Sequence, residues 1–370
     1  MVNLKAQYLR LKNEVDSALM QVVESAQYIN GPQVQEFAGA LQKYLSVEAV
    51  VPCANGTDAL QLALMALELQ PGDEVITTAF SFVASAEVIA LLGLTPVFAD
   101  INPQTFNIDA GDIEKRITSK TKVILPVHLF GQAADMEAIM QVAGQYGLYV
   151  IEDVAQSLGA TCYYKGKNRL AGTIGHIGCT SFFPSKNLGC FGDGGACFTR
   201  DTALADRMKM IAGHGSNKQY HHQVIGINSR LDTLQAAVLC VKLPYLDAFI
   251  SERRKVAGVY DVILKEVGPI EIPVTLENAR HSYNQYTIRV KNGKRDALME
   301  GLDRMGIPSR IYYPLPLHQQ LVFNGYICAS QYLPHAEKAC DEVLSLPLHT
   351  EMEPGEAEYI ARSIVSLLIE

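Results

Sequence analysis

Short β-like runs alternate with amphipathic helical stretches between residues 74 and 152, and this alternation restricts the fold more than any other feature. The expected elements, in chain order, are strand 74–78, helix 82–92, strand 96–99, helix 109–116, strand 123–127, helix 135–146 and strand 149–152. Strands joined by helices pair in parallel, with helices on both faces of the sheet. We therefore predict an α/β fold whose ligands lie beyond the carboxyl ends of the strands.

The rest of the chain extends this fold and adds a second region. The further expected elements are helices 4–22, 34–44, 59–69, 231–241, 246–264, 297–305 and 356–368, and β-like runs 49–51, 178–183, 286–290 and 309–313. A chain of 370 residues is longer than most domains that fold around a single hydrophobic core. We predict a large domain over 1–245 and a smaller C-terminal α+β domain over 246–370.

Composition excludes several classes of function. The net charge of −8 argues against a nucleic-acid partner held on a basic surface. The eight cysteines contain no CxxC pair, so we expect small buried side chains in a reducing compartment and no metal site. We see no leader or membrane-spanning pattern, and expect a soluble cytoplasmic protein with no membrane partner.

Lys186 is the first candidate for chemistry. It lies between an apolar run, 178–183, and a segment with four glycines, 189–195, whose backbone can pass close to a ligand. A lysine at a strand end beside a desolvated pocket loses its proton more readily. The neutral amine can then condense with an aldehyde.

Two further groups are expected at the same edge of the sheet. Asp153 ends one strand, and the loop 55–58 leads into a helix whose free backbone N–H groups favour an anion. Pyridoxal phosphate needs a lysine for its aldehyde, a carboxylate for its ring nitrogen and backbone amides for its phosphate. The three groups together therefore indicate a pyridoxal phosphate site.

Taken one by one, these residues have simpler interpretations. Asp153 and the loop 55–58 could each cap a helix, and Lys186 could be a solvated loop residue. Phe82, at an apolar helix start, is more often a core residue. Gln156 and Ser181 could be solvated or bonded to their own backbone, so the residues alone leave these alternatives open.

Eight ordered stretches carry a resemblance to a known family. They are 30–32 (NGP), 53–60 (CANGTDAL), 71–76 (PGDEVI), 151–157 (IEDVAQS), 181–186 (SFFPSK), 192–195 (GDGG), 228–235 (NSRLDTLQ) and 312–318 (YYPLPLH). With them the chain resembles, over essentially its whole length, the DegT/DnrJ/StrS family of sugar-nucleotide aminotransferases. That resemblance implies the aspartate-aminotransferase-like fold (fold type I), with a large mixed, mainly parallel sheet between helices.

The resemblance also implies a role for each site residue. Lys186 and Asp153 would be catalytic, with Lys186 bonded to pyridoxal 5′-phosphate and Asp153 paired with its ring nitrogen. The other expected cofactor contacts are Gln156 at the ring hydroxyl, Phe82 on the ring face, Gly56, Thr57 and Ser181 at the phosphate, and Asn228 at the phosphate of the neighbouring subunit. Because Asn228 would act across subunits, the resemblance implies a homodimer with shared active sites.

The implied reaction moves an amino group from L-glutamate to a keto sugar nucleotide. The runs 213–222 and 228–232 are similar to the branch that aminates C3 of UDP-2-acetamido-2-deoxy-3-oxo-D-glucuronate, for O-antigen synthesis. Arg230 would grip the carboxylates of glutamate and of the uronate, or form an ordinary ion pair with Asp232. Tyr313 and His318 would line the sugar side, or serve packing.

Four alternatives remain to be weighed. A dTDP-3-keto-6-deoxyhexose 3-aminotransferase would share the same cofactor site. A sugar dehydratase on this scaffold would have histidine where this chain has Lys186. A non-catalytic regulatory protein would not need the cofactor residues, and a Rossmann dehydrogenase is excluded because no GxGxxG follows the first strand.

Overall fold

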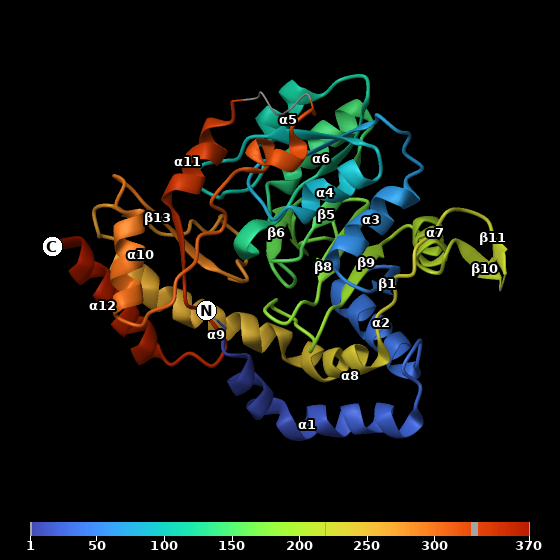
Figure 1. Ribbon diagram of the computed structural model, residues 1–370, viewed down its shortest axis with the longest axis horizontal. Helices are drawn as coiled ribbons and strands as arrows, with labels where there is room; N and C mark the ends of the chain where they lie inside the picture. The colour runs from blue at the N-terminus through green and yellow to red at the C-terminus, as the bar shows by residue number, and fades with distance from the viewer. Residues whose placement is uncertain (1, 219, 327–331, 370) are drawn as a thin grey trace.

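A seven-stranded mixed sheet forms the centre of the molecule, in a computed structural model that describes residues 2–218, 220–326 and 332–369 (Figure 1). Its strands, in order across the sheet, are β3 (Thr95–Ala99), β2 (Glu74–Thr78), β4 (Thr121–Leu125), β5 (Tyr149–Asp153), β8 (Ile177–Ser181), β9 (Gly195–Thr199) and β1 (Ala49–Cys53). Only β9 runs against its two neighbours. The predicted mixed, mainly parallel sheet is therefore confirmed. Cys328 lies outside the described residues.

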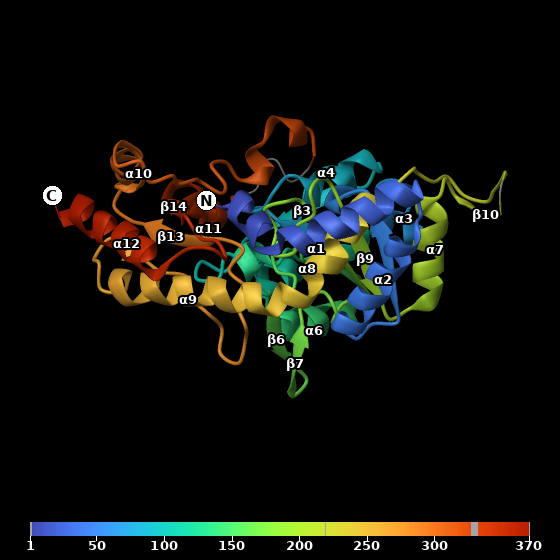
Figure 2. The same cartoon turned by 90° about the horizontal axis from the view of Figure 1, so that it is seen from below.

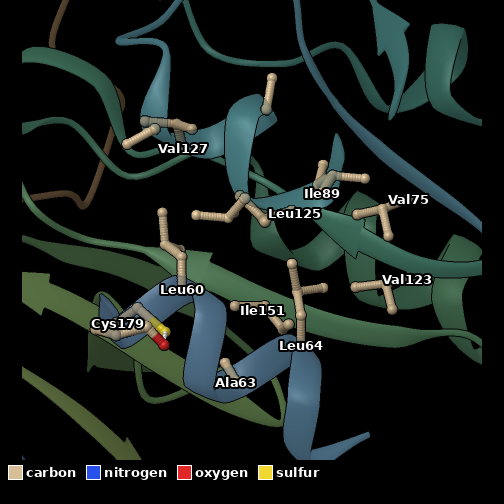
Figure 3. Close-up of a cluster of buried hydrophobic side chains, with 14 of the residues drawn as sticks. Leu60, Ala63, Leu64, Val75, Ile89, Val123, Leu125, Val127, Ile151 and Cys179 are labelled. Atoms are coloured by element: carbon tan, nitrogen blue, oxygen red, sulfur yellow. Dashed lines mark hydrogen bonds between the residues drawn. The ribbon is translucent and has the colours of Figure 1, made fainter. Parts of the chain in front are cut away.

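Helices cover both faces of this sheet. They are α2 (Pro32–Leu45), α3 (Gly56–Ala66), α4 (Ala84–Leu91), α5 (Ala110–Arg116), α6 (Met136–Tyr146), α7 (Thr202–Ala212) and α8 (Thr233–Lys242). Consecutive strand residues point to opposite faces, so β5 places Ile151 in the core under α3 and Val150 in the core on the other face. Figure 3 shows Leu60 and Leu64 of α3 against Ile151. Because both faces are buried, the sequences of the strands are nearly continuous apolar runs.

The C-terminal part has its own core. It is built from α9 (Leu246–Leu264), β12 (Ile270–Glu271), β13 (Tyr286–Val290), α10 (Arg295–Arg304), β14 (Val343–Leu346) and α12 (Pro354–Ile369). Because Ile250 packs in a core of the large sheet and Tyr260 in the C-terminal core, the change of core falls within α9. The division at residue 245 stays a prediction.

Helix α8, the short turn η2 (Leu243–Tyr245) and α9 form one helical stretch, Thr233–Leu264, that is long and apolar enough to cross a membrane. In the most apolar 18-residue window of this stretch, 56% is buried inside the protein. It also contains two buried charged residues, Lys242 and Arg253. These are the properties of a core helix.

The other elements lie around the sheet or extend from it (Figure 2). They are α1 (Leu4–Ser25), η1 (Leu129–Gly131), β6 (Thr161–Tyr164), β7 (Lys167–Leu170), β10 (Ser216–Lys218), β11 (His221–His222), η3 (Leu317–Gln319), η4 (Leu321–Phe323) and α11 (Pro334–Glu342). The hairpin of β10 and β11 projects from the end of the molecule opposite to the C-terminus in both views (Figures 1 and 2).

One predicted strand was wrong. Residues 309–313 do not form a strand, because only Arg310 pairs with its neighbour, exchanging backbone hydrogen bonds of 3.1 and 2.8 Å with Ser345. The chain then leaves β14, and the Tyr313 hydroxyl reaches Gln156 in the turn that follows β5. A side-chain contact with the other sheet therefore replaces the expected pairing.

Candidate active site

The two residues predicted to be catalytic lie at one edge of the sheet. Strands β5 and β8 are parallel neighbours, with Asp153 opposite Cys179, so both end on the same side. Strand β8 ends at Ser181, and a turn closed by the N–H of Lys186 and the carbonyl of Phe183, 2.8 Å apart, follows it. The parallel order of the strands therefore brings Lys186 and Asp153 to the same site.

Each of these two groups changes the ionisation of the other. Burial lowers the pKa of Lys186, and the negative charge of Asp153 offsets part of this effect. Burial raises the pKa of Asp153, and the N–H of Ala155 and the positive charge of Lys186 oppose this effect. Lys186 is thus an amine whose environment favours the neutral, nucleophilic form.

Asp153 does not cap a helix, which was its alternative interpretation. Its Oδ1 accepts the N–H of Ala155 at 3.0 Å, and the chain after it forms turns rather than a helix. The side chain is buried, with 8% of the residue exposed. A buried carboxylate that is not used as a cap is available to bind a partner such as a protonated ring nitrogen.

The loop between β1 and α3 forms a cradle for an anion. Helix α3 begins at Gly56, three residues earlier than predicted, so the N–H groups of Gly56 and Thr57 lie in its free first turn. Asn55 caps this helix, with its Oδ1 2.8 Å from the N of Asp58. A Cβ added at Gly56 would lie 2.6 Å from Cβ of Ser181. Glycine therefore lets the helix N-terminus and the Ser181 hydroxyl approach each other, as a phosphate site requires.

Gln156 is held between two elements. Its Oε1 accepts the N–H of Phe130 at 2.7 Å, and its Nε2 donates to the Tyr313 hydroxyl at 3.1 Å. Burial raises the pKa of Tyr313, and the negative charge of Asp153 adds to this effect. Gln156 and Tyr313 thus belong to the same site as Asp153, and Gln156 is not solvated.

Phe82 is not a core residue. It precedes the first turn of α4, and 56% of it is exposed. A large exposed aromatic side chain beside the carboxyl edge of β2 is available to cover the face of a ring.

Three predicted residues lie outside the group just described. Asn228 and Arg230 are exposed on either side of the buried Ser229, whose hydroxyl accepts the N–H of Ala54 at 3.0 Å. No acidic side chain among the described residues lies within salt-bridge distance of Arg230. His318 is only 1% exposed, and its Nε2 lies 3.2 Å from Oε1 of Glu337, which is the packing arrangement left open above.

Sequence reasoning missed a buried pair behind Asp153. The Nε2 of His128 lies 2.8 Å from Oε2 of Glu152, and both side chains are fully buried. A carboxylate inside the apolar strand β5 was the available signal, because a buried charge needs a partner. No cluster of His, Cys, Asp or Glu that could hold a metal ion occurs within residues 2–218, 220–326 and 332–369.

Comparisons with known proteins find similarity over nearly the whole chain. A model of the DegT/DnrJ/EryC1/StrS aminotransferase family matches residues 10–365. The UDP-2-acetamido-2-deoxy-3-oxo-D-glucuronate aminotransferase of Pseudomonas aeruginosa is 45% identical, over 99% of this chain and 99% of its own. A pleiotropic regulatory protein of Geobacillus stearothermophilus is 46% identical, over 98% of this chain and 97% of its own. The crystal structure of NtdA from Bacillus subtilis, with bound cofactor PMP, has a TM-score of 0.89 at 35% identity and covers 97% of this chain and 82% of that chain.

Proposed function

This chain belongs to the DegT/DnrJ/EryC1/StrS aminotransferase family, and we propose that it transfers the amino group of L-glutamate to a keto sugar attached to a nucleotide. The observation that carries the proposal is the meeting of Lys186 and Asp153 at one sheet edge, each altering the pKa of the other. The residues present fit pyridoxal phosphate, since the amine and the buried acid follow the adjacent strands β8 and β5, and Gly56 of the cradle lies against Ser181 at the end of β8.

When bound, the cofactor supplies an electron-withdrawing ring that stabilises negative charge on the reacting carbon. In this proposal, Asp153 holds the ring nitrogen, Gln156 the ring hydroxyl, and Phe82 covers the ring. Gly56, Thr57 and Ser181 hold the phosphate. Lys186 would hold the aldehyde carbon, and its Nζ would take up and return the proton that moves during transfer.

The acceptor we favour is UDP-2-acetamido-2-deoxy-3-oxo-D-glucuronate. The likeness to the UDP-2-acetamido-2-deoxy-3-oxo-D-glucuronate aminotransferase of Pseudomonas aeruginosa supports this choice, and so does Arg230, whose exposed guanidinium suits a carboxylate. Its product would serve O-antigen or another surface polysaccharide. We further infer a cytoplasmic homodimer, in which the exposed Asn228 reaches the phosphate of the partner and Tyr313 belongs to the sugar side.

Two alternative functions are considered, another sugar acceptor and a regulatory role. A dTDP-3-keto-6-deoxyhexose acceptor would use the same cofactor residues. The likeness to a pleiotropic regulatory protein favours a regulatory role. Lys186 and the buried Asp153 are nevertheless both present at one site, which a purely regulatory protein would not need.

The test is amine transfer measured directly. The purified protein, converted to its amino form with glutamate, is given a panel of UDP- and dTDP-keto sugars, and products are followed by mass spectrometry. We expect amination of the 3-oxo-uronate, loss of all transfer in Lys186→Ala, and normal transfer in Lys265→Ala, which removes an exposed lysine at the end of α9. Cofactor binding without transfer to any sugar of the panel would favour the regulatory role.

A further inference from the structure

One buried histidine, His128, makes hydrogen bonds to three residues in or behind the site. The backbone N–H of His128 donates to the carbonyl of Asp153 at 2.9 Å. Its Nε2 lies 2.8 Å from Oε2 of Glu152, and its Nδ1 accepts the N–H of Ala134 at 2.9 Å. His128 therefore links β5 to the loop that follows β4.

These contacts fix the state of the imidazole. Because Nδ1 accepts an N–H, the proton of the neutral ring is on Nε2, which donates to Glu152. The Glu152 carboxylate also accepts the N–H groups of Gly172, Ile174 and Gly175, at 2.8, 2.7 and 2.6 Å. Burial alone would raise the pKa of Glu152, but the bonds from His128, Gly175 and Gly172 lower it overall. Glu152 is thus a fully satisfied, ionised anchor.

The anchor controls how β5 presents Asp153. Neighbouring residues of a strand point to opposite faces, so the side chain of Glu152 is fastened on the face away from Asp153. The same histidine holds the carbonyl of Asp153. Rotation of this part of the strand would therefore break both bonds. The loop from His128 to Ala134 also contains Phe130, whose N–H fixes Gln156 at 2.7 Å.

We propose that His128 is a positioning residue, which through Glu152 and the loop 129–134 sets the orientation of Asp153 and Gln156 toward the cofactor. The inference rests on the proposed roles of Asp153 and Gln156, but not on the identity of the sugar.

The test compares two histidines that are bonded to the same strand. His128→Asn keeps an acceptor near the Nδ1 position and loses the donor to Glu152. His176→Asn is the matched control, because Nδ1 of His176 accepts the N–H of Val150 at 2.9 Å at the other end of β5. For each variant, pyridoxal phosphate binding, the absorption of the bound cofactor and the thermal midpoint with and without cofactor are measured.

We expect both variants to lower the midpoint without cofactor. Only His128→Asn should bind pyridoxal phosphate about tenfold more weakly, the usual effect of losing an outer hydrogen bond that orients a ligand-binding group. In His128→Asn the absorption band of the bound cofactor should also shift. The increase in thermal midpoint on adding the cofactor should be smaller than in the wild type. A purely structural role would leave these three readouts at their wild-type values.

Wild-type affinity and absorption in His128→Asn would overturn the inference. If that variant does not fold, Glu152→Gln, which leaves the imidazole in place, is measured in the same way, and wild-type affinity there would overturn it. The variant Asp153→Asn distinguishes failure of the proposed function from failure of the inference about His128. If it binds the cofactor normally, the proposed role of Asp153 fails, and if it binds weakly while His128→Asn binds normally, only the present inference fails.

Discussion

Lys186 combines two opposing influences on one amine. Burial lowers its pKa from 10.5, and the carboxylate of Asp153 raises it. The covalent capture of pyridoxal phosphate needs the neutral amine, so its rate should reach half of its maximum below pH 10.5. Removing the negative charge in Asp153→Asn should move this midpoint to still lower pH. Stopped-flow absorption against pH measures it, and a midpoint that stays or rises in Asp153→Asn contradicts the coupling.

Arg230 is exposed and pairs with no acidic side chain within the part of the chain that the structure describes, and we interpret it as a clamp for carboxylates. Arg230→Ala should reduce kcat/KM roughly thirtyfold for glutamate and for the uronate, which corresponds to a loss of about 2 kcal/mol of transition-state stabilisation for each. Binding of pyridoxal phosphate should not change. Arg169→Ala, which removes another exposed arginine on β7, is the control. Turnover of both carboxylates near the wild-type rate would remove the clamp from the account.

Glu152 should make stability depend on pH. Its pKa in the folded protein is below the ordinary value of 4.5, so its contribution is complete above 4.5 and is lost as the pH falls further. Glu152→Gln should lower the free energy of unfolding by about 2 to 3 kcal/mol at neutral pH. The difference from wild type should shrink below pH 4.5. Urea unfolding across this range measures it, and a difference that grows as the pH falls would contradict the assignment.

Among single residues, those that directly follow a strand could be placed in the site from the sequence. Residues whose partner lies on a turn that folds back onto the sheet could not. Lys186 and Asp153 could be predicted to meet because parallel strands end on one side. The pair of His128 and Glu152 depends on the turn at 172–175, which folds back onto β5. No spacing in the sequence indicates that return.

At the scale of elements, the start of α3 matters most. An Ala- and Leu-rich stretch predicted a helix from residue 59, but the Asn55 side chain caps the chain at Asp58, so the helix begins at Gly56. The polar first turn has no helical periodicity to reveal it. It is nevertheless this turn that supplies the backbone N–H groups of the cradle.

Gly56→Ala should close the cradle. The new Cβ would lie 2.6 Å from Cβ of Ser181, so the helix start or β8 must move, at a cost of about 1 to 3 kcal/mol in unfolding free energy. Affinity for pyridoxal phosphate should fall as well. Gly39→Ala in α2, where a Cβ meets nothing within 4 Å, should keep the affinity and gain up to about 1 kcal/mol. Equal cofactor titrations for both variants would show that the cradle does not hold the phosphate.

At the scale of the whole molecule, the sequence predicted the layered architecture but not the order of the strands. The mainly parallel sheet follows from alternation, whereas the position of β1 beside β9 at the edge depends on long-range packing. A helical stretch that runs through the expected boundary at 245 was also not foreseen, because α9 carries apolar residues for two cores in turn.

The proposed shared site can be tested by mixing two inactive variants. Lys186→Ala and Asn228→Ala should each lose most activity alone. If Asn228 serves the partner's site, subunit exchange restores one of the two sites in each mixed dimer, or about half of the wild-type activity in the purified mixed dimer. Tandem purification and a transamination assay measure this. If Asn228 served the site of its own chain, mixing would restore nothing.

The most direct measurement of the central claim is to locate the covalent bond itself. The protein is loaded with pyridoxal phosphate, reduced with borohydride, digested and analysed by tandem mass spectrometry. We expect the pyridoxyl group on Lys186, and none on the Lys186→Ala variant. A pyridoxyl group on any other lysine, with Lys186 unmodified, would contradict it.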